Sequence, residues 1–134
     1  MDLAKYRALF LEEATEHLAE MSRACLALEK DPGSGEAIDL VFRMAHSIKG
    51  MAASLDYDSV TQLAHRLEDR MAVWRAQGRV DTPAGLLMLF RGLEGLERMV
   101  AAVRANGSSP PVDAALLAEL AAADTPLGGA EKKA

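Results

Sequence analysis

The chain has 134 residues and a formal net charge of −5 at pH 7, and half of its residues are hydrophobic although only 4% are aromatic. This length fits one domain with its own core, and a core poor in aromatic side chains is typical of helices packed on helices. The acidic charge argues against a nucleic-acid partner, and neither a membrane-spanning apolar run nor a secretory signal is present.

The first predicted helix covers residues 2–30, where apolar residues recur at helical spacing. Its stripe includes His17, which we interpret as a core or seam residue. The single cysteine, Cys25, can form no internal disulfide, so the sequence favours a reducing cytoplasm. The inward-facing set of this helix is Leu3, Phe10, Ala14, His17, Met21, Ala24 and Leu28.

The second predicted helix, residues 36–54, contains a histidine followed by a cation and a glycine. His46 falls at the margin of the apolar face, where a side chain can be packed on one edge and open to solvent on the other. Lys49 follows at i+3 and Gly50 at i+4, on the same side of the helix. Glycine costs about 1 kcal/mol relative to alanine in a helix interior. We therefore interpret Gly50 as clearing space beside an imidazole that could carry a phosphoryl group.

Two further long helices are predicted. The third ends at Gly78 and has Asp58 or Ser59 as its cap. The fourth begins at Thr82-Pro83, read as a cap followed by a proline at the first helical position, and runs to about residue 105.

A carboxylate follows the third histidine on the third helix. His65 has Glu68 at i+3, on the same side of the helix. A carboxylate that accepts an imidazole N–H fixes the tautomer and makes the other ring nitrogen more nucleophilic. If the second and third helices pack side by side, Glu68 could do this for His46 as well as for His65.

A short fifth helix is predicted over about residues 112–123, with Asp113 as its cap. Residues 124–134 are small, polar and glycine-bearing, and we expect a flexible tail or linker there. Short turns between four long helices predict an all-α fold, an antiparallel up-down four-helix bundle with the fifth helix added at its C-terminal end. The predicted domain is residues 1–123, with its bundle core in 1–106.

The two histidine motifs together resemble the histidine phosphotransfer domain of the chemotaxis kinase family (CheA-type). The resemblance rests on His46-Ser47-Ile48-Lys49-Gly50 followed by His65-Arg66-Leu67-Glu68-Asp69, and it covers about residues 1–105. It implies that His46 is the phosphoacceptor, on its outer ring nitrogen, and that Glu68 orients and activates the ring through the other nitrogen. It also implies that Lys49 and His65 are polar neighbours of the phosphoryl group and that Gly50 gives access to it.

The resemblance implies a role in two-component chemotaxis signalling. A kinase catalytic domain, in the same or a separate polypeptide, would phosphorylate His46 from ATP, and the phosphoryl group would pass to an aspartate of a CheY-like response regulator receiver domain. The chain lacks a Gly-x-x-x-x-Gly-Lys loop. We therefore expect a cytoplasmic phosphocarrier with no cofactor of its own that does not phosphorylate itself, although the full-length protein is expected to be a histidine kinase. Mg-ATP and Mg²⁺ would belong to the partner kinase domain and the response regulator.

Two other classes of function stay open. A non-catalytic interaction or dimerisation bundle would leave the interior glycine and its cation unexplained, unless Gly50 lets another helix approach closely in the core. A metal-binding bundle could use His65-x-x-Glu68, but di-iron bundles use Glu-x-x-His twice with further carboxylates, and this chain has the reverse order once. Relatives of the chemotaxis kinases also often have Gly-Phe where this chain has Asp56-Tyr57, which could alter that turn and the choice of partner.

Overall fold

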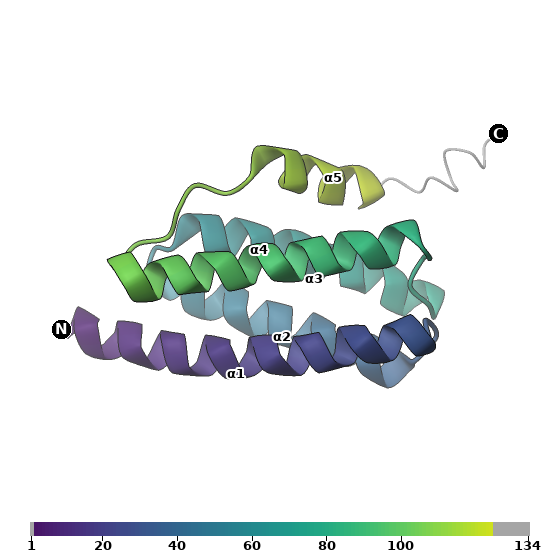
Figure 1. Cartoon of the computed structure of the whole chain (residues 1–134), viewed down its shortest axis with the longest axis horizontal. Helices are drawn as coiled ribbons and strands as arrows, with labels where there is room; N and C mark the ends of the chain where they lie inside the picture. The colour runs from purple at the N-terminus through teal and green to yellow at the C-terminus, as the bar shows by residue number, and fades with distance from the viewer. Residues whose placement is uncertain (1, 125–134) are drawn as a thin grey trace.

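The computed structural model describes residues 2–124, which form five α-helices (Figure 1). The four long helices lie along one axis, and each contacts two others: α1 packs on α2 and α4, and α3 packs on α2 and α4. This order confirms the predicted all-α four-helix bundle. The helices are α1 (Leu3–Lys30), α2 (Gly35–Ser54), α3 (Asp58–Gln77), α4 (Ala84–Asn106) and α5 (Ala114–Asp124).

Polar caps and glycines explain where several helices begin and end. Asp2 and Ser34 cap α1 and α2, each accepting from the amide three residues along the chain, at 3.1 and 3.2 Å. α3 and α4 both end at a glycine in the left-handed region, Gly78 with φ 86° and Gly107 with φ 80°. Glycine adopts this conformation without a steric penalty, so it terminates a helix cleanly.

The predicted cap of the third helix is wrong. α3 begins at Asp58 itself, and Tyr57 occupies the N-cap position without a side-chain hydrogen bond. Ser59 is buried, and its hydroxyl lies 2.6 Å from that of Ser109 in the segment before α5. The serine is therefore used in a tertiary contact rather than at the helix start.

The predicted start of the fourth helix is also wrong, by one residue. The N-cap is Pro83 rather than Thr82, and the first helical residue is Ala84. The backbone carbonyls of Asp81 and Pro83 accept from amides of the first turn at 3.0 Å. These carbonyls serve the amides of Leu86 and Leu87, and no side chain caps the helix.

The fifth helix and its cap are present as predicted. The Asp113 carboxylate accepts from the amides of Ala115 and Leu116, at 2.9 and 3.3 Å. α5 lies against α3 and α4 and buries Leu116 and Leu120. The helix extends to Asp124, one residue beyond its predicted end, and the rest of the predicted tail, residues 125–134, lies outside the described residues.

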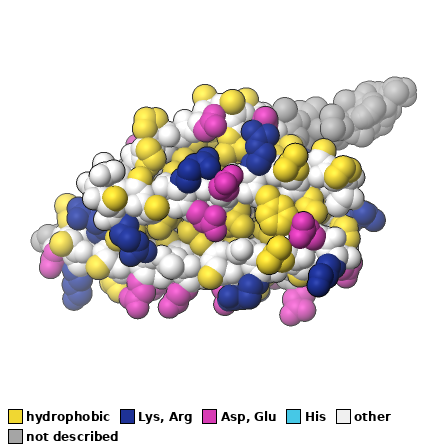
Figure 2. Space-filling view, in the orientation of Figure 1, with side chains coloured by type: hydrophobic (Ala, Val, Ile, Leu, Met, Phe, Trp, Pro, Cys, Tyr) yellow, Lys and Arg dark blue, Asp and Glu magenta, His cyan; other side chains and the backbone are white. Residues whose placement is uncertain are grey.

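The core lies along the bundle axis and is mainly aliphatic. Its largest fully buried side chains include Trp74, Met21, Leu28, Ile38, Ile48, Leu63 and Leu67. Figure 2 shows the face formed by α1, α4 and α5, where acidic, basic and apolar side chains are interspersed and no histidine is visible. Among residues 2–124, no helix has the length and hydropathy needed to cross a membrane.

Candidate functional site

The packing of α2 on α3 brings together three polar side chains from the two histidine motifs. His46 and Glu68 are 22 residues apart in sequence, yet Nδ1 of His46 lies 2.6 Å from Oε2 of Glu68. The other carboxylate oxygen, Oε1, lies 2.7 Å from Nζ of Lys49. One carboxylate therefore holds both the imidazole and the cation across the seam between the helices.

The three side chains differ in exposure in a way that suits this arrangement. His46 is 64% exposed, whereas Lys49 is 27% and Glu68 only 12% exposed. The position of His46 at the margin of the apolar face explains this, because Ala45 and Ile48 beside it in sequence point into the core and are fully buried. The carboxylate is fixed in the seam while the imidazole remains open to solvent.

The electrostatics of the cluster define the tautomer of the imidazole. Burial raises the pKa of Glu68, but its hydrogen bonds to Lys49 and His46 outweigh that effect and hold the pKa below its usual value. An ionised carboxylate can only accept hydrogen bonds. In the neutral imidazole, Nδ1 of His46 therefore carries the hydrogen and donates a hydrogen bond to Glu68, which leaves the lone pair on Nε2. Within residues 2–124, Nε2 has no hydrogen-bond partner.

Gly50 leaves open surface beside this ring. The residue is exposed, and a Cβ built on it would meet no atom within 4 Å outside its own helix backbone. The alternative in which Gly50 lets another helix approach closely in the core is therefore wrong. The glycine lies one turn beyond His46 on the same side of α2. No side chain therefore projects beside the imidazole at this position.

The other two histidines lie outside the cluster of His46, Lys49 and Glu68. His65 is 55% exposed, and its Nε2 lies 3.6 Å from Oδ1 of Asp69 on the next turn of α3. Its carboxylate partner is thus Asp69 rather than Glu68, and its role beside a phosphoryl group stays a prediction. His17 is half-buried on α1, consistent with a seam position.

A second charged cluster, Asp39 and Arg43 of α2 with Arg75 of α3, was not predicted. Asp39 accepts from Nε of Arg43 at 2.9 Å and from Nη1 of Arg75, on α3, at 3.1 Å. The Arg75 guanidinium also stacks over the Phe42 ring, 3.9 Å from its centroid. The two arginines lower the pKa of Asp39 below its usual value. The i,i+4 spacing of Asp39 and Arg43 could have revealed the first pair, but the contact with Arg75 depends on how α2 and α3 pack.

The turn between α2 and α3 accommodates the departure at Asp56-Tyr57. Asp56 has φ 60°, in the left-handed region that glycine enters most readily and aspartate tolerates. Tyr57 packs against Phe10 of α1, with ring centroids 5.2 Å apart. An aspartate can therefore stand at this position in a turn that a glycine would also form.

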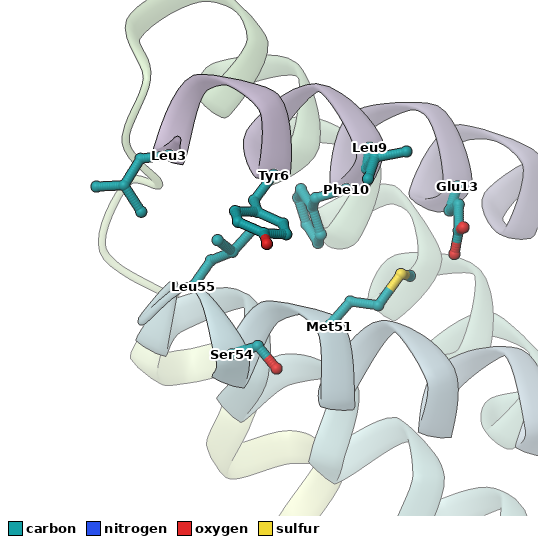
Figure 3. A pocket seen from close by; sticks show the side chains of 8 residues that line it. All are labelled: Leu3, Tyr6, Leu9, Phe10, Glu13, Met51, Ser54 and Leu55. Carbon is teal, nitrogen blue, oxygen red and sulfur yellow. The ribbon is translucent and has the colours of Figure 1, made fainter. Parts of the chain in front are cut away.

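An apolar hollow of about 360 Å³ lies between α1 and the C-terminal part of α2 (Figure 3). In Figure 3 the side chains of Tyr6, Phe10, Met51 and Leu55 face this space. Its one charged lining residue is Glu13, so it is separate from the cluster at His46. Among the side chains that the structure describes, residues 2–121, no three or more histidine, cysteine, aspartate or glutamate residues are placed to hold a metal ion, so the metal-binding alternative lacks a donor set there.

Comparisons with known proteins agree with this geometry. The family model described as "Hpt domain" matches residues 5–106. The chain is 36% identical over 107 residues to the chemotaxis protein CheA of Bacillus subtilis, which covers 80% of this chain and 16% of the relative. It is 34% identical over 103 residues to CheA of Halobacterium salinarum, covering 76% of this chain and 15% of the relative. The chain thus spans only about a sixth of the length of these relatives.

A solved structure supports the fold. It is the crystal structure of the phosphorylated P1 domain of CheA3 in complex with CheY6 from R. sphaeroides, and it matches with a TM-score of 0.78. The match covers 90% of this chain and 95% of that one, at 23% sequence identity. The overall helical fold is therefore one already seen in a solved structure.

Proposed function

This chain belongs to the Hpt domain family, and from that premise we propose that it is the phosphocarrier segment of a chemotaxis signalling kinase, with His46 as the phosphoacceptor. The observation that carries the proposal is the contact of Nδ1 with Glu68 at 2.6 Å on a His46 side chain that is 64% exposed. The relatives are named as chemotaxis proteins, and the structural neighbour is a phosphorylated domain bound to CheY6. The proposed partners are accordingly a kinase catalytic domain and a CheY-like receiver domain.

In the loading step, the Nε2 lone pair of His46 attacks the γ-phosphorus of ATP held by the kinase domain. The N–P bond forms as the P–O bond to the leaving ADP breaks, and positive charge develops on the imidazole. The Glu68 carboxylate accepts the Nδ1–H hydrogen bond and stabilises that charge. Because Lys49 holds the other carboxylate oxygen, Glu68 is fixed in position before the reaction begins.

In the unloading step, a receiver aspartate oxygen attacks the phosphorus and the N–P bond breaks. The electron pair returns to Nε2, and the ring regains the tautomer it had before loading. Because Gly50 has no side chain, a partner surface can approach His46 during both steps. We place Mg-ATP and the receiver's Mg²⁺ in the partners, with no cofactor in this domain, and we place the domain in the cytoplasm, where ATP is supplied.

The acceptor is tested by replacing each histidine in turn. His46→Gln keeps a polar side chain of similar size but removes the nucleophile. With a chemotaxis kinase catalytic domain and labelled ATP, we expect this variant to stay unlabelled while His17→Gln and His65→Gln accept label that is lost in acid and kept in base. The domain with Mg-ATP alone should also stay unmodified. Labelling of His46→Gln would show that another residue is the acceptor.

A further inference from the structure

His46 lies between two cations on its own helix. Lys49 is at i+3 and Arg43 at i−3, so at 3.6 residues per turn they lie about 60° to opposite sides of His46 around the α2 axis. Residues spaced three apart are neighbours on a helix surface. Gly50, at i+4, lies about 40° to the Arg43 side on the following turn and contributes no side chain there. An anion attached to Nε2 would therefore be flanked by a cation on each side.

Lys49 and Arg43 differ in the ion pairs that they already make. Lys49 is half-buried and engaged with Glu68 at 2.7 Å, and that carboxylate also holds the imidazole. Arg43 is 57% exposed and is bound only through Nε, to Asp39 at 2.9 Å. Its two terminal nitrogens make no hydrogen bond or ion pair with the side chains that the structure describes, residues 2–121. The guanidinium on this flank therefore has donors that the ground state leaves unused.

Asp39 can release Arg43 without losing all of its cationic partners. Its other oxygen accepts from Arg75 at 3.1 Å, and Arg75 is itself held over the Phe42 ring. The low pKa of Asp39 keeps it charged at neutral pH. Arg43 could thus move from the Asp39 carboxylate to a phosphoryl group on His46. Asp39 would remain paired with Arg75 across the seam between α2 and α3.

We propose that Arg43 is a second cationic ligand of the phosphoryl group on His46, and that Asp39 holds it in reserve until the group arrives. The inference rests on the proposed function of His46. A phosphoryl group carries up to two negative charges at neutral pH, whereas the charges of Lys49 and Glu68 offset each other. Arg43 supplies the missing positive charge through its terminal nitrogens, in the geometry that guanidinium groups use for phosphate oxygens.

The test uses the whole chain, labelled with ¹⁵N and loaded with phosphoramidate or, if that reagent is too slow, with a histidine kinase catalytic domain. On loading, we expect the side-chain N–H signals of Arg43 to shift and those of Arg98 to stay in place. Arg98 is a matched control because it forms an exposed i,i+4 pair with Glu94, at 3.6 Å, on α4.

The second readout is the pKa of the phosphoryl group itself, followed by ³¹P NMR. Arg43→Gln should raise it by a few tenths of a unit to about one unit, the size expected of an exposed ion pair. Asp39→Asn should lower it by freeing Arg43, and Arg98→Gln should leave it unchanged. Lys49, Glu68 and, on α3, His65 are the same in every variant, so their effects cancel in the comparison. Thermal melts check that each variant is folded.

The outcomes separate this inference from the function on which it rests. A ³¹P signal that disappears in His46→Gln but is identical in wild type, Arg43→Gln and Arg98→Gln overturns the role of Arg43 and leaves His46 as the acceptor. The absence of any His46-dependent signal with both loading methods overturns the proposed function and this inference with it.

Discussion

At the scale of single residues, the site gives the two nitrogens of one imidazole different tasks. Nδ1 of His46 is fixed by a mostly buried carboxylate, and Nε2 faces solvent. Lys49 fixes the carboxylate in turn, so an exposed side chain acquires a defined tautomer and orientation. In the proposed mechanism, these three residues suffice to prepare a nucleophile on a helix surface.

Replacing Glu68 by glutamine should slow loading of His46 by about ten- to a hundred-fold, or roughly 1.4 to 2.7 kcal/mol of barrier. The amide still reaches Nδ1, but it no longer stabilises positive charge on the ring. Rapid-quench measurement with a kinase domain and labelled ATP gives the rate. Glu20→Gln is the control, because Glu20 pairs with Arg23 on the surface of α1. Equal rates for both variants would remove Glu68 from the mechanism.

Replacing Gly50 should separate stability from access. Since a Cβ there meets no atom within 4 Å, Gly50→Ala should raise the free energy of unfolding by about 0.5 to 1 kcal/mol. Gly50→Leu should remain folded but slow phosphotransfer, because a long side chain one turn from His46 obstructs the partner. Thermal melts and transfer rates measure the two effects. A destabilised alanine variant with normal transfer from its folded fraction would contradict the access role.

The sequence predicted the residues of this cluster but not all of their contacts. The spacing of Lys49 and Gly50 after His46 was informative because i+3 and i+4 neighbours share a helix side. The same reasoning could not decide whether Glu68 pairs with His46 or with His65. Spacing within α3 does not show which side chain of α2 lies beside Glu68. Only the packing of α2 on α3 assigns Glu68 to His46 and leaves His65 to Asp69.

At the scale of elements, α4 uses glycine for a purpose opposite to that of α2. Gly85, Gly92 and Gly95 are buried, and a Cβ on each would come within 3.0 Å of an atom outside α4. At Gly92 and Gly95 that atom belongs to a leucine of α3, Leu67 and Leu63 respectively. These glycines permit α3 and α4 to approach closely, whereas Gly50 faces open solvent.

Replacing Gly92 by alanine should therefore destabilise the bundle. The new Cβ would lie 2.6 Å from Cδ2 and 3.1 Å from Cγ of Leu67, so the whole side chain must move. The resulting overpacking should cost about 1 to 3 kcal/mol and exceed the gain in helix propensity. Chemical denaturation of Gly92→Ala beside Gly50→Ala tests this, since the same substitution should have opposite signs at the two sites. A stabilised Gly92→Ala variant would contradict the predicted close packing.

The existence and order of the helices could be predicted from the sequence, but some of their ends could not. Apolar spacing and the glycine at 78 located the long helices because these signals are local. Ser59 misled the prediction because its hydroxyl is engaged with Ser109, fifty residues away. Leu3 has helical spacing with the core residues of α1, yet it is 60% exposed and lies at the rim of the hollow in Figure 3.

At the scale of the whole molecule, one thiol reports on the integrity of the bundle. Cys25 is fully buried on α1, and burial together with the negative charge of Glu97 raises the pKa of its thiol to about 12. The thiolate is the reactive form of cysteine. Access to Cys25 therefore depends on opening the bundle as well as on deprotonation.

We expect Cys25 in the folded domain to react with a disulfide reagent at pH 8 at least about a thousand-fold more slowly than the thiol of the unfolded chain, whose pKa is about 8.5. The rate should rise along the unfolding transition measured by circular dichroism in urea. Rapid labelling without denaturant, at the rate of the unfolded chain, would show that this part of α1 is not packed as described.

In the proposed cycle, the exposure of the His46 ring also limits how long the domain can hold a phosphoryl group. With 64% of its side chain open, a phosphoryl group on Nε2 would meet water as readily as it meets a partner. Each loaded molecule would then reset itself by hydrolysis if no partner came first. In the proposed cycle, the fraction of domains phosphorylated on His46 therefore reflects the recent rate of loading and falls when loading stops.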